Sequence, residues 1–510
     1  MEKRYLIGID QSTSGTKALL YNRTGSIVKR VDIPHFQKYP QPGWVEHDPE
    51  ELLANTLLAA KNVLEQTGID TDSVSAIALT NQRETAVVWN RRTGKPVYNA
   101  VVWQCQRGTE ICARLAASGA EKMVREKTGL VLSPYFSAAK IAWILEEVPG
   151  ARQAADRGDL LCGTIDSWLI WNLSGCTVHA TDYSNASRTQ LFNLTTLDWD
   201  DELLRLFGIP RSMLGEVRFS DVEFGHTDLD GLLPSPVPVT GVMGDSHAAL
   251  FGQNCFSRGM AKATYGTGSS IMMHIGNQPV LSERGLVTSI AWGMGRNVEY
   301  VFEGNINCAG STISWLADNV GLIDSPKNAG ALASTVDDTG GVYLVPAFVG
   351  LGAPYWKSTA RASISGMTLG TKKAHIVRAA VESIAYQIKD ILDLMVQEST
   401  TNLRELRVDG GLTNDAFLMQ FQADILGITV APSAVEELSA TGSAYMAGLA
   451  TGFWSTKAEI ESLRVSMKPY NRNMEGGRVA QLYAGWQEAI HRTVCPPAAD
   501  ASSSTTLASS

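Results

Sequence analysis

Two stretches of the chain repeat one pattern of apolar and small polar positions. Residues 5–10 form a short apolar run typical of a strand, a turn of small hydroxyl residues follows, and a strand pattern resumes at residues 17–22. The same order recurs downstream, where strand patterns at residues 260–265 and 271–273 flank the Gly/Ser/Thr turn 266–270. Each stretch predicts a β-hairpin, and a tip without bulky side chains can surround a phosphate group with backbone amides and hydroxyls.

The rest of the chain alternates between helical and strand periodicity. Leucines recur at helical spacing in residues 49–65, and residues 73–81 follow as an apolar strand. In the second half, residues 375–397 have helical spacing, and the strand pattern 406–409 precedes a pair of glycines. We expect an α/β fold with two related domains that each present one hairpin to a shared cleft.

The length and composition agree with two domains. A chain of 510 residues exceeds the roughly 250 to 300 residues at which a single hydrophobic core stops growing. We therefore expect domains at residues 1–253 and 254–494. With 44% hydrophobic and 19% charged residues, the body resembles ordinary globular proteins. The tail 495–510, rich in Ser, Thr and Ala, is predicted to be disordered.

The overall charge argues against some classes of partner. A net charge of −9 opposes binding to nucleic acid or anionic lipid, which needs clustered Lys and Arg. No apolar run reaches the roughly 18 to 20 residues of a membrane-spanning helix, and no secretory signal is recognisable. The seven cysteines are scattered, without a CxxC pair. The sequence predicts a cytoplasmic protein with reduced cysteines that binds a small molecule and does not insert into membranes.

Several segments spread over nearly the whole chain carry a family resemblance. They are residues 42–49, 81–85, 99–105, 181–188, 350–356 and 417–422, together with the longer stretches 135–147 and 366–382. These segments resemble the FGGY carbohydrate kinases, and within them the glycerol kinases. The resemblance implies two ribonuclease H-like domains of the actin-like ATPase type that flank a central catalytic cleft and close over ATP, Mg²⁺ and the acceptor. It also implies assembly into a homodimer or homotetramer.

Transfer of a phosphoryl group to an alcohol requires a carboxylate that accepts the hydroxyl proton. Asp245 follows the largely apolar run 237–242, which would place it at the end of a strand facing the cleft. It resembles the catalytic base of the family. The alternative is that Asp245 only caps a helix that begins near His247.

Four residues resemble the acceptor pocket of the family. Arg83 and Glu84 directly follow the predicted strand 76–80, so both can reach a ligand at its end. A guanidinium that donates and a carboxylate that accepts suit the neighbouring hydroxyls of a polyol, although in most proteins such a pair belongs to a solvated loop. Trp103 and Tyr135 resemble an aromatic wall and a hydroxyl-bonding tyrosine, with core aromatics as the alternative interpretation.

The nucleotide and its metal are assigned by resemblance to residues of both hairpins and nearby turns. Asp10 resembles the carboxylate that holds Mg²⁺, through water because this ion often retains its waters. The predicted nucleotide-binding residues are Thr13, Ser14, Lys17, Thr267, Gly310, Ser314, Gly411 and Asp415. Lys17 stands where the glycerol kinases carry arginine, which keeps the charge but loses bidentate geometry. Ser314 and Asp415 replace a glutamine and an asparagine of those kinases.

Two departures from the glycerol kinases lie in the expected acceptor pocket. Ser246 stands where they have glutamine, and Ser270 stands where they have a phenylalanine that packs against the acceptor carbons. Both changes remove volume, which favours a polyol or ketose larger than glycerol. Residues 231–236 also lack the Gly and Arg pattern of the loop that binds fructose bisphosphate in regulated bacterial glycerol kinases, so we expect no such control.

Several functions remain open on these grounds. The leading hypothesis is an ATP-dependent kinase that transfers the γ-phosphate to a terminal hydroxyl of glycerol. An alternative within that class is a kinase for erythritol, threitol, a pentitol, xylulose or ribulose. A non-catalytic sugar-sensing protein is the alternative of another class, which the retained Asp10 and Asp245 oppose. An actin-like or chaperone-like ATPase would not need the acceptor pocket.

Overall fold

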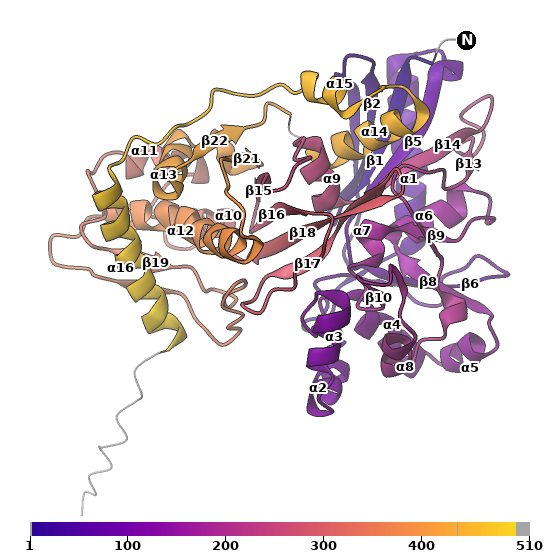
Figure 1. Ribbon diagram of the computed structural model, residues 1–510, viewed down its shortest axis with the longest axis horizontal. Helices are drawn as coiled ribbons and strands as arrows, with labels where there is room; N and C mark the ends of the chain where they lie inside the picture. The colour runs from indigo at the N-terminus through magenta and orange to yellow at the C-terminus, as the bar shows by residue number, and fades with distance from the viewer. Residues whose placement is uncertain (1–2, 436, 496–510) are drawn as a thin grey trace, which may run out of the picture.

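The first half of the chain builds a six-stranded mixed sheet (Figure 1). The computed structural model describes residues 3–435 and 437–495, and the predicted tail lies outside the described residues from position 496 onward. The strands are, in spatial order, β13 (His226–Thr227), β14 (Val237–Gly244), β5 (Val74–Asn81), β1 (Tyr5–Gln11), β2 (Gly15–Asn22) and β3 (Ile27–Pro34). β1 pairs antiparallel with β2 and parallel with β5, which pairs parallel with β14. The first predicted hairpin is confirmed as β1 and β2, and the predicted strand at residues 73–81 is confirmed as β5.

The second half builds a six-stranded sheet on the same plan. Its spatial order is β17 (Val287–Met294), β18 (Asn297–Ile306), β16 (Ser269–Gly276), β15 (Ala261–Tyr265), β21 (Glu405–Asp409) and β22 (Thr429–Pro432). β15 pairs antiparallel with β16 and parallel with β21, as β1 does with β2 and β5. The second predicted hairpin is therefore confirmed, and the two halves are related in architecture as the repeated sequence pattern predicted.

The two halves interlock through α9 (Asp245–Gly252) and α14 (Leu438–Thr451). α14 follows the second sheet in sequence, yet it packs against β1, β5 and β14, and Figure 1 shows it in yellow-orange beside the indigo and purple strands. A Cβ atom at Gly442 would lie 1.8 Å from the carbonyl oxygen of Ala248, so the two helices touch through their backbones. The division at residues 253 and 254 stays a prediction, since a later segment completes the first half.

Helices cover the remaining faces of the sheets. The predicted helices at 49–65 and 375–397 are confirmed as α1 (Pro49–Thr67) and α12 (Lys373–Ser399). Other helices that flank the sheets and the cleft are α4 (Ser137–Glu147), α6 (Ile165–Leu173), α7 (Tyr183–Ala186), α10 (Gly310–Asp318), α13 (Ala416–Leu426) and α16 (Gly476–Val494). Within the described ranges, no helix combines the length and apolar character needed to cross a bilayer.

Candidate functional site

Asp245 lies where the parallel strands of the first sheet end. Asp10 pairs with Thr80 across β1 and β5, and Gly244 pairs with Asn81 across β14 and β5. Asp10, Arg83 and Asp245 therefore lie at one edge of the sheet, the edge at which open α/β sheets bind ligands. Asp245 is the first residue of α9 and Gly244 occupies the N-cap position. The alternative prediction of a capping aspartate is wrong.

The Asp245 carboxylate is held in place but remains accessible. Its Oδ1 accepts a hydrogen bond from the backbone N–H of Ser246 at 2.6 Å and lies 3.1 Å from Nε of Arg83. The side chain keeps 34% of its surface exposed. A carboxylate oriented by two donors at one oxygen can use its other oxygen to accept a proton from a ligand.

Arg83 and Glu84 belong to a buried ionic cluster, so the interpretation as a solvated loop is wrong. Glu303 of β18 accepts hydrogen bonds from Nη1 and Nη2 of Arg83, both at 2.8 Å, and lies 2.9 Å from Nη1 of Arg188. Nε of Arg188 donates to Oε1 of Glu84 at 2.6 Å. Two guanidiniums and two carboxylates from both halves of the chain form this ionic cluster, with Asp245 at its edge.

The pKa values of the two carboxylates in the ionic cluster are shifted in opposite directions. Burial acts to raise the pKa of Glu303, but Arg188 and Arg83 outweigh it and hold that pKa well below its ordinary value. Burial raises the pKa of Glu84 in spite of Arg188. The backbone of Glu84 has a φ of 63°, which is uncommon outside glycine and is found at sites where the surrounding contacts hold a strained conformation.

Trp103 and Tyr135 form one wall beside the ionic cluster. Their rings pack edge to face with centroids 5.5 Å apart, and both side chains are half-buried rather than enclosed in the core. Nε1 of Trp103 donates to Oγ1 of Thr13 at 3.0 Å, which joins this wall to the first hairpin tip. Burial raises the pKa of Tyr135, so its hydroxyl stays protonated and can donate a hydrogen bond.

Ser246, the residue after Asp245, contacts Ser270. Oγ of Ser270 lies within hydrogen-bond distance of Oγ of Ser246, at 3.4 Å, and both side chains are half-buried. Ser246 comes from α9 and Ser270 from β16, so this contact also spans the two halves. Both side chains are short hydroxyls, as the sequence predicted for this part of the acceptor pocket.

Asp10 is a buried carboxylate with an incomplete set of partners. Among the residues that the structure describes, its Oδ1 has no hydrogen-bond partner. Nζ of Lys17 lies 3.6 Å from Oδ2 of Asp10 and donates to Oε2 of Glu437 at 2.7 Å. Burial raises the pKa of Asp10 to about 7, and the charges of Asp245 and Glu437 also raise it, whereas Lys17 lowers it. A cation would offset the negative charge gathered here.

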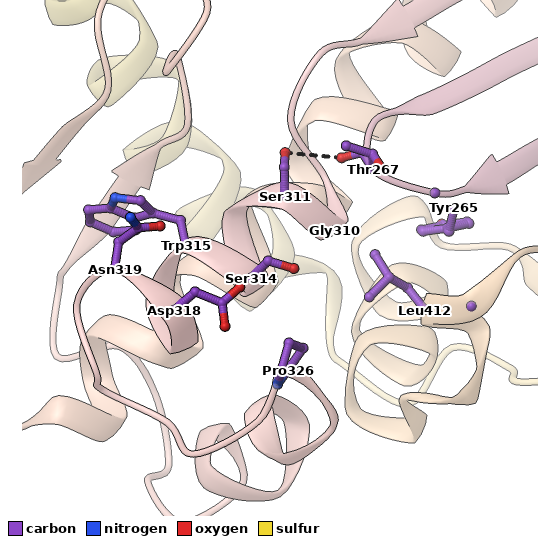
Figure 2. Close-up of a pocket in the computed structure, with 12 residues that line it drawn as sticks. Tyr265, Thr267, Gly310, Ser311, Ser314, Trp315, Asp318, Asn319, Pro326 and Leu412 are labelled. Carbon is purple, nitrogen blue, oxygen red and sulfur yellow. Dashed lines mark hydrogen bonds between the residues drawn. The ribbon is translucent and has the colours of Figure 1, made fainter. Parts of the chain in front are cut away.

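A cavity of about 450 Å³ lies between α10 and the turn after β21 (Figure 2). Ser311 donates from its Oγ to the carbonyl oxygen of Thr267 at 3.1 Å, the dashed contact in Figure 2, and so fixes the start of α10 to the second hairpin tip. A Cβ atom at Gly411 would meet no atom within 4 Å, so glycine there leaves space open. The cavity is lined by four predicted nucleotide-binding residues, which are Thr267, Gly310, Ser314 and Gly411.

A second cavity adjoins this one at Gly411. It has a volume of about 360 Å³, shares Gly411 with the first cavity, and is also lined by Asp409 and Glu437. Glu437 is the ion-pair partner of Lys17 on β2, so this cavity is bordered by a residue that contacts the first hairpin. Asp415 lies outside the residues that line either cavity. Its carboxylate instead accepts from the backbone N–H of Leu418 at 3.1 Å and caps α13.

Sequence reasoning missed two members of the ionic cluster. Glu303 received no role, although it is the one charged residue in the run 300–306, whose other residues are Tyr, Val, Phe, Gly, Asn and Ile. A lone charge in a buried strand needs a partner, and that is the signal that could have identified it. Arg188 was included only as the end of the matching segment 181–188. Both side chains are almost completely buried.

Comparisons with known proteins agree with this architecture. The FGGY family of carbohydrate kinases matches with its N-terminal domain at residues 5–252 and its C-terminal domain at residues 261–451. A glycerol kinase of Stenotrophomonas maltophilia (strain K279a) is 51% identical over 97% of this chain and 99% of its own length. Glycerol kinase 1 of Thermotoga maritima is 51% identical over 96% of this chain and 99% of its own length.

Solved structures of kinases share the fold of this chain. The crystal structure of Plasmodium falciparum glycerol kinase with ADP superposes with a TM-score of 0.91 at 37% identity, covering 96% of this chain and 98% of that one. A xylulose kinase from Lactobacillus acidophilus superposes with a TM-score of 0.86 at 21% identity, covering 96% and 97%, which supports the fold alone. The predicted pair of actin-like ATPase domains is confirmed. The chain belongs to the FGGY family of carbohydrate kinases.

Proposed function

We propose that the protein is an ATP-dependent kinase that transfers the γ-phosphate of ATP to a terminal hydroxyl of glycerol. The observation that carries this proposal is the position of Asp245, an accessible carboxylate 3.1 Å from Arg83 and near enough to Asp10 for their charges to interact. The full-length similarity to proteins named glycerol kinase supports glycerol as the acceptor.

The chemistry at the acceptor begins with Asp245. Its carboxylate accepts the proton of the acceptor hydroxyl as that oxygen forms a bond to the γ-phosphorus, and the bond to ADP breaks. Arg83 donates to a neighbouring hydroxyl of the acceptor and Glu84 accepts from another. Trp103 and Tyr135 cover the carbon chain and exclude water, which would otherwise compete as the nucleophile.

The nucleotide would lie along the two connected cavities. Thr13, Ser14 and Thr267 are suited to donate to its phosphates, because the two hairpin tips offer hydroxyls and backbone N–H groups without bulky side chains. Lys17 adds a positive charge near these tips. Gly310, Ser314 and Gly411 line the cavity that would hold the nucleoside. For Asp415 we retain only a supporting role, the capping of α13.

We propose Asp10 as the residue that holds Mg²⁺. Its buried Oδ1, which has no hydrogen-bond partner among the described residues, is an oxygen ligand of the type that Mg²⁺ prefers. No cluster of three His, Cys, Asp or Glu side chains among residues 3–435 and 437–495 could enclose a metal ion. This agrees with an ion that keeps several waters and binds substrate phosphates, because such an ion needs few protein ligands. When bound, Mg²⁺ would neutralise charge on the triphosphate.

Measurement of ADP release with ATP and glycerol tests the proposal. We expect turnover by the wild type and a loss of about 10²- to 10⁴-fold in kcat for Asp245→Asn, with ATP binding retained. Asp337→Asn, the same change at an exposed position, is the matched control. A protein that binds ligand without producing ADP would instead be the sugar sensor of the alternative hypothesis.

Two further features belong to the proposal. Ser246 and Ser270 favour acceptors larger than glycerol as a second candidate, because they are shorter than the glutamine and phenylalanine of the glycerol kinases that the sequence resembles. We also propose a cytoplasmic location and a homodimer or homotetramer, on the family resemblance. Light scattering coupled to size-exclusion chromatography tests the oligomeric state.

A further inference from the structure

Lys140 of α4 is a buried lysine near the acceptor residues, and no step of the proposed mechanism uses it. Its side chain has no exposed surface. Burial lowers the pKa of Lys140 to about 7, whereas the nearby charge of Glu84 raises it. Lysine is almost never fully buried in proteins unless it is paired. The partners of its ammonium group therefore indicate why a lysine stands at this position.

The ammonium group of Lys140 binds three consecutive backbone carbonyls. Nζ donates to the carbonyl oxygens of Pro134 at 2.6 Å, of Tyr135, and of Phe136 at 2.9 Å. An ammonium has three N–H groups, so these acceptors use all of them. Three adjacent carbonyls that turn toward one atom fix the path of the main chain. Tyr135, which carries one ring of the acceptor wall, lies in the middle of this turn.

The turn 134–136 contacts both parts of the acceptor site. The ring of Tyr135 packs against Trp103 and against Phe136, with centroids 5.5 and 5.2 Å apart. The guanidinium carbon of Arg188 lies 5.1 Å from the centroid of the Phe136 ring, which is a cation–π contact. The turn therefore touches the aromatic wall through one ring and the ionic cluster through the other. Because the main chain sets where both rings lie, the contacts of Lys140 affect both.

Ser137, the first residue of α4, holds a second acceptor residue. Its Oγ donates to the backbone carbonyl oxygen of Glu84 at 3.0 Å, and its side chain is completely buried. The hydrogen bond stabilises Glu84 in its uncommon backbone conformation with a φ of 63°. The backbone N–H of Ala138 donates to the carbonyl oxygen of Thr189 at 2.9 Å, next to Arg188. The first turn of α4 thus contacts the segments that carry Glu84 and Arg188.

We propose that Lys140 and Ser137 are positioning residues for the acceptor site. Lys140 holds the turn 134–136 so that Tyr135 keeps its place in the acceptor wall, and Ser137 holds the backbone of Glu84. Both side chains are fully buried, so they act through these neighbours and not on the acceptor itself. This inference rests on the proposed kinase function. A displacement of about 1 Å at a group that orients the substrate can cost about 100-fold in rate.

The experiment measures ADP release by full-length Lys140→Met and Ser137→Ala. Glycerol is varied at saturating ATP, and ATP is varied at saturating glycerol. Methionine keeps an unbranched chain but cannot donate to the three carbonyls, and alanine removes one hydroxyl. We expect the KM for glycerol to rise by about tenfold or more in Lys140→Met and by about three- to tenfold in Ser137→Ala. The KM for ATP should stay within about twofold of wild type in both variants.

The controls separate positioning from a general loss of stability. Lys3→Met removes an ammonium that donates to two backbone carbonyls, those of Asp72 and Val74, at the end of β5 opposite to the one that precedes Arg83. It should leave both KM values unchanged. Thermal unfolding shows which variants are folded at the assay temperature. A merely structural contribution would lower Tm and the apparent kcat without a selective rise in the KM for glycerol. If Lys140→Met does not fold, Ser137→Ala alone decides the test.

Each result has one interpretation. A KM for glycerol within about twofold of wild type in a folded variant would overturn the role of the residue replaced, and would leave the proposed function standing. A rise in the KM for ATP as large as that for glycerol would overturn the assignment to the acceptor site. An absence of turnover by the wild type would overturn the proposed function, and this inference with it.

Discussion

The substitution Glu303→Gln tests whether the ionic cluster holds the acceptor site together. Glu303 accepts two hydrogen bonds from Arg83 and one from Asn305, and it lies 2.9 Å from Arg188. Glutamine keeps the shape of the side chain but removes its charge, and its amide N–H₂ would face guanidinium donors. Two buried guanidiniums would then share the carboxylate of Glu84, with Asp245 as a partly exposed second partner.

The expected cost follows from the burial of these charges. Removal of one partner from a buried ion pair destabilises a protein by about 3–5 kcal/mol, because the remaining charge stays desolvated. For a cooperative unit of roughly 150–250 residues, each kcal/mol lowers Tm by about 2–4 °C, so we expect a decrease of about 6 °C or more. The matched control is Glu65→Gln, which removes a surface pair with Lys61 at 3.8 Å and should cost less than about 0.5 kcal/mol.

The pH dependence gives a second readout. The pKa of Glu303 is depressed in the folded state, so its stabilising contribution is fully present above the unfolded-state pKa of about 4.3 and is lost as the pH falls toward the folded pKa. The difference in Tm between wild type and Glu303→Gln should therefore be constant from about pH 5.5 to 8 and narrow below about pH 4.3.

Thermal unfolding followed by circular dichroism measures the decrease in Tm and its pH dependence, and the steady-state assay with glycerol measures the change in kcat. Released from Glu303, Arg83 can pair more closely with Asp245, so kcat should fall as well. A Tm within about 1 °C of wild type near neutral pH would refute the reasoning. So would a decrease of the same size in the Glu65→Gln control.

Three further predictions follow from separate parts of the structure. Asp10→Asn should lower activity at limiting Mg²⁺ by about 10- to 100-fold, and because burial raises the pKa of Asp10, calorimetry should find the variant no less stable than wild type. Gly442→Ala should destabilise the fold by about 1–3 kcal/mol through a clash with the Ala248 carbonyl, whereas denaturant unfolding of Gly477→Ala, where a Cβ meets no atom within 4 Å, should change little. Titration with fructose bisphosphate should leave activity unchanged, and strong inhibition would show that our interpretation of residues 231–236 is wrong.

The sequence was sufficient for features that depend on local patterns. Both hairpins, the strand before Asp245 and the long helix α12 have periodicity or turn residues that specify them within a short window. The clustering of Asp10, Arg83 and Asp245 also follows from a general rule, since parallel strands end at the same edge of a sheet. The rule accounts for the position of Asp245, whereas its role as catalytic base is assigned by resemblance to the FGGY kinases.

The features that the sequence did not reveal depend on contacts between distant segments. Glu303 and Arg83 are 220 positions apart, and no local pattern indicates which buried charges pair with each other. The return of α14 to the first sheet likewise has no signal in its own sequence. Asp415 is the opposite case. Its family position suggested a contact with the nucleotide, whereas its observed hydrogen bond, from the backbone N–H of Leu418, follows from the local preference of aspartate for helix N-caps.

The ionic cluster also explains why neither half of the chain could carry the acceptor site alone. Arg83, Glu84 and Arg188 come from the first half and bring two positive charges against one negative charge, and Glu303 of the second half supplies the missing one. Without Glu303, Arg83 would have only the partly exposed carboxylate of Asp245 as a further counter-charge, and poor compensation of a buried guanidinium is costly in a region of low dielectric. The acceptor residues therefore reach their observed arrangement only when β18 is docked against the first half. Formation of the acceptor site and association of the two halves are thus one event.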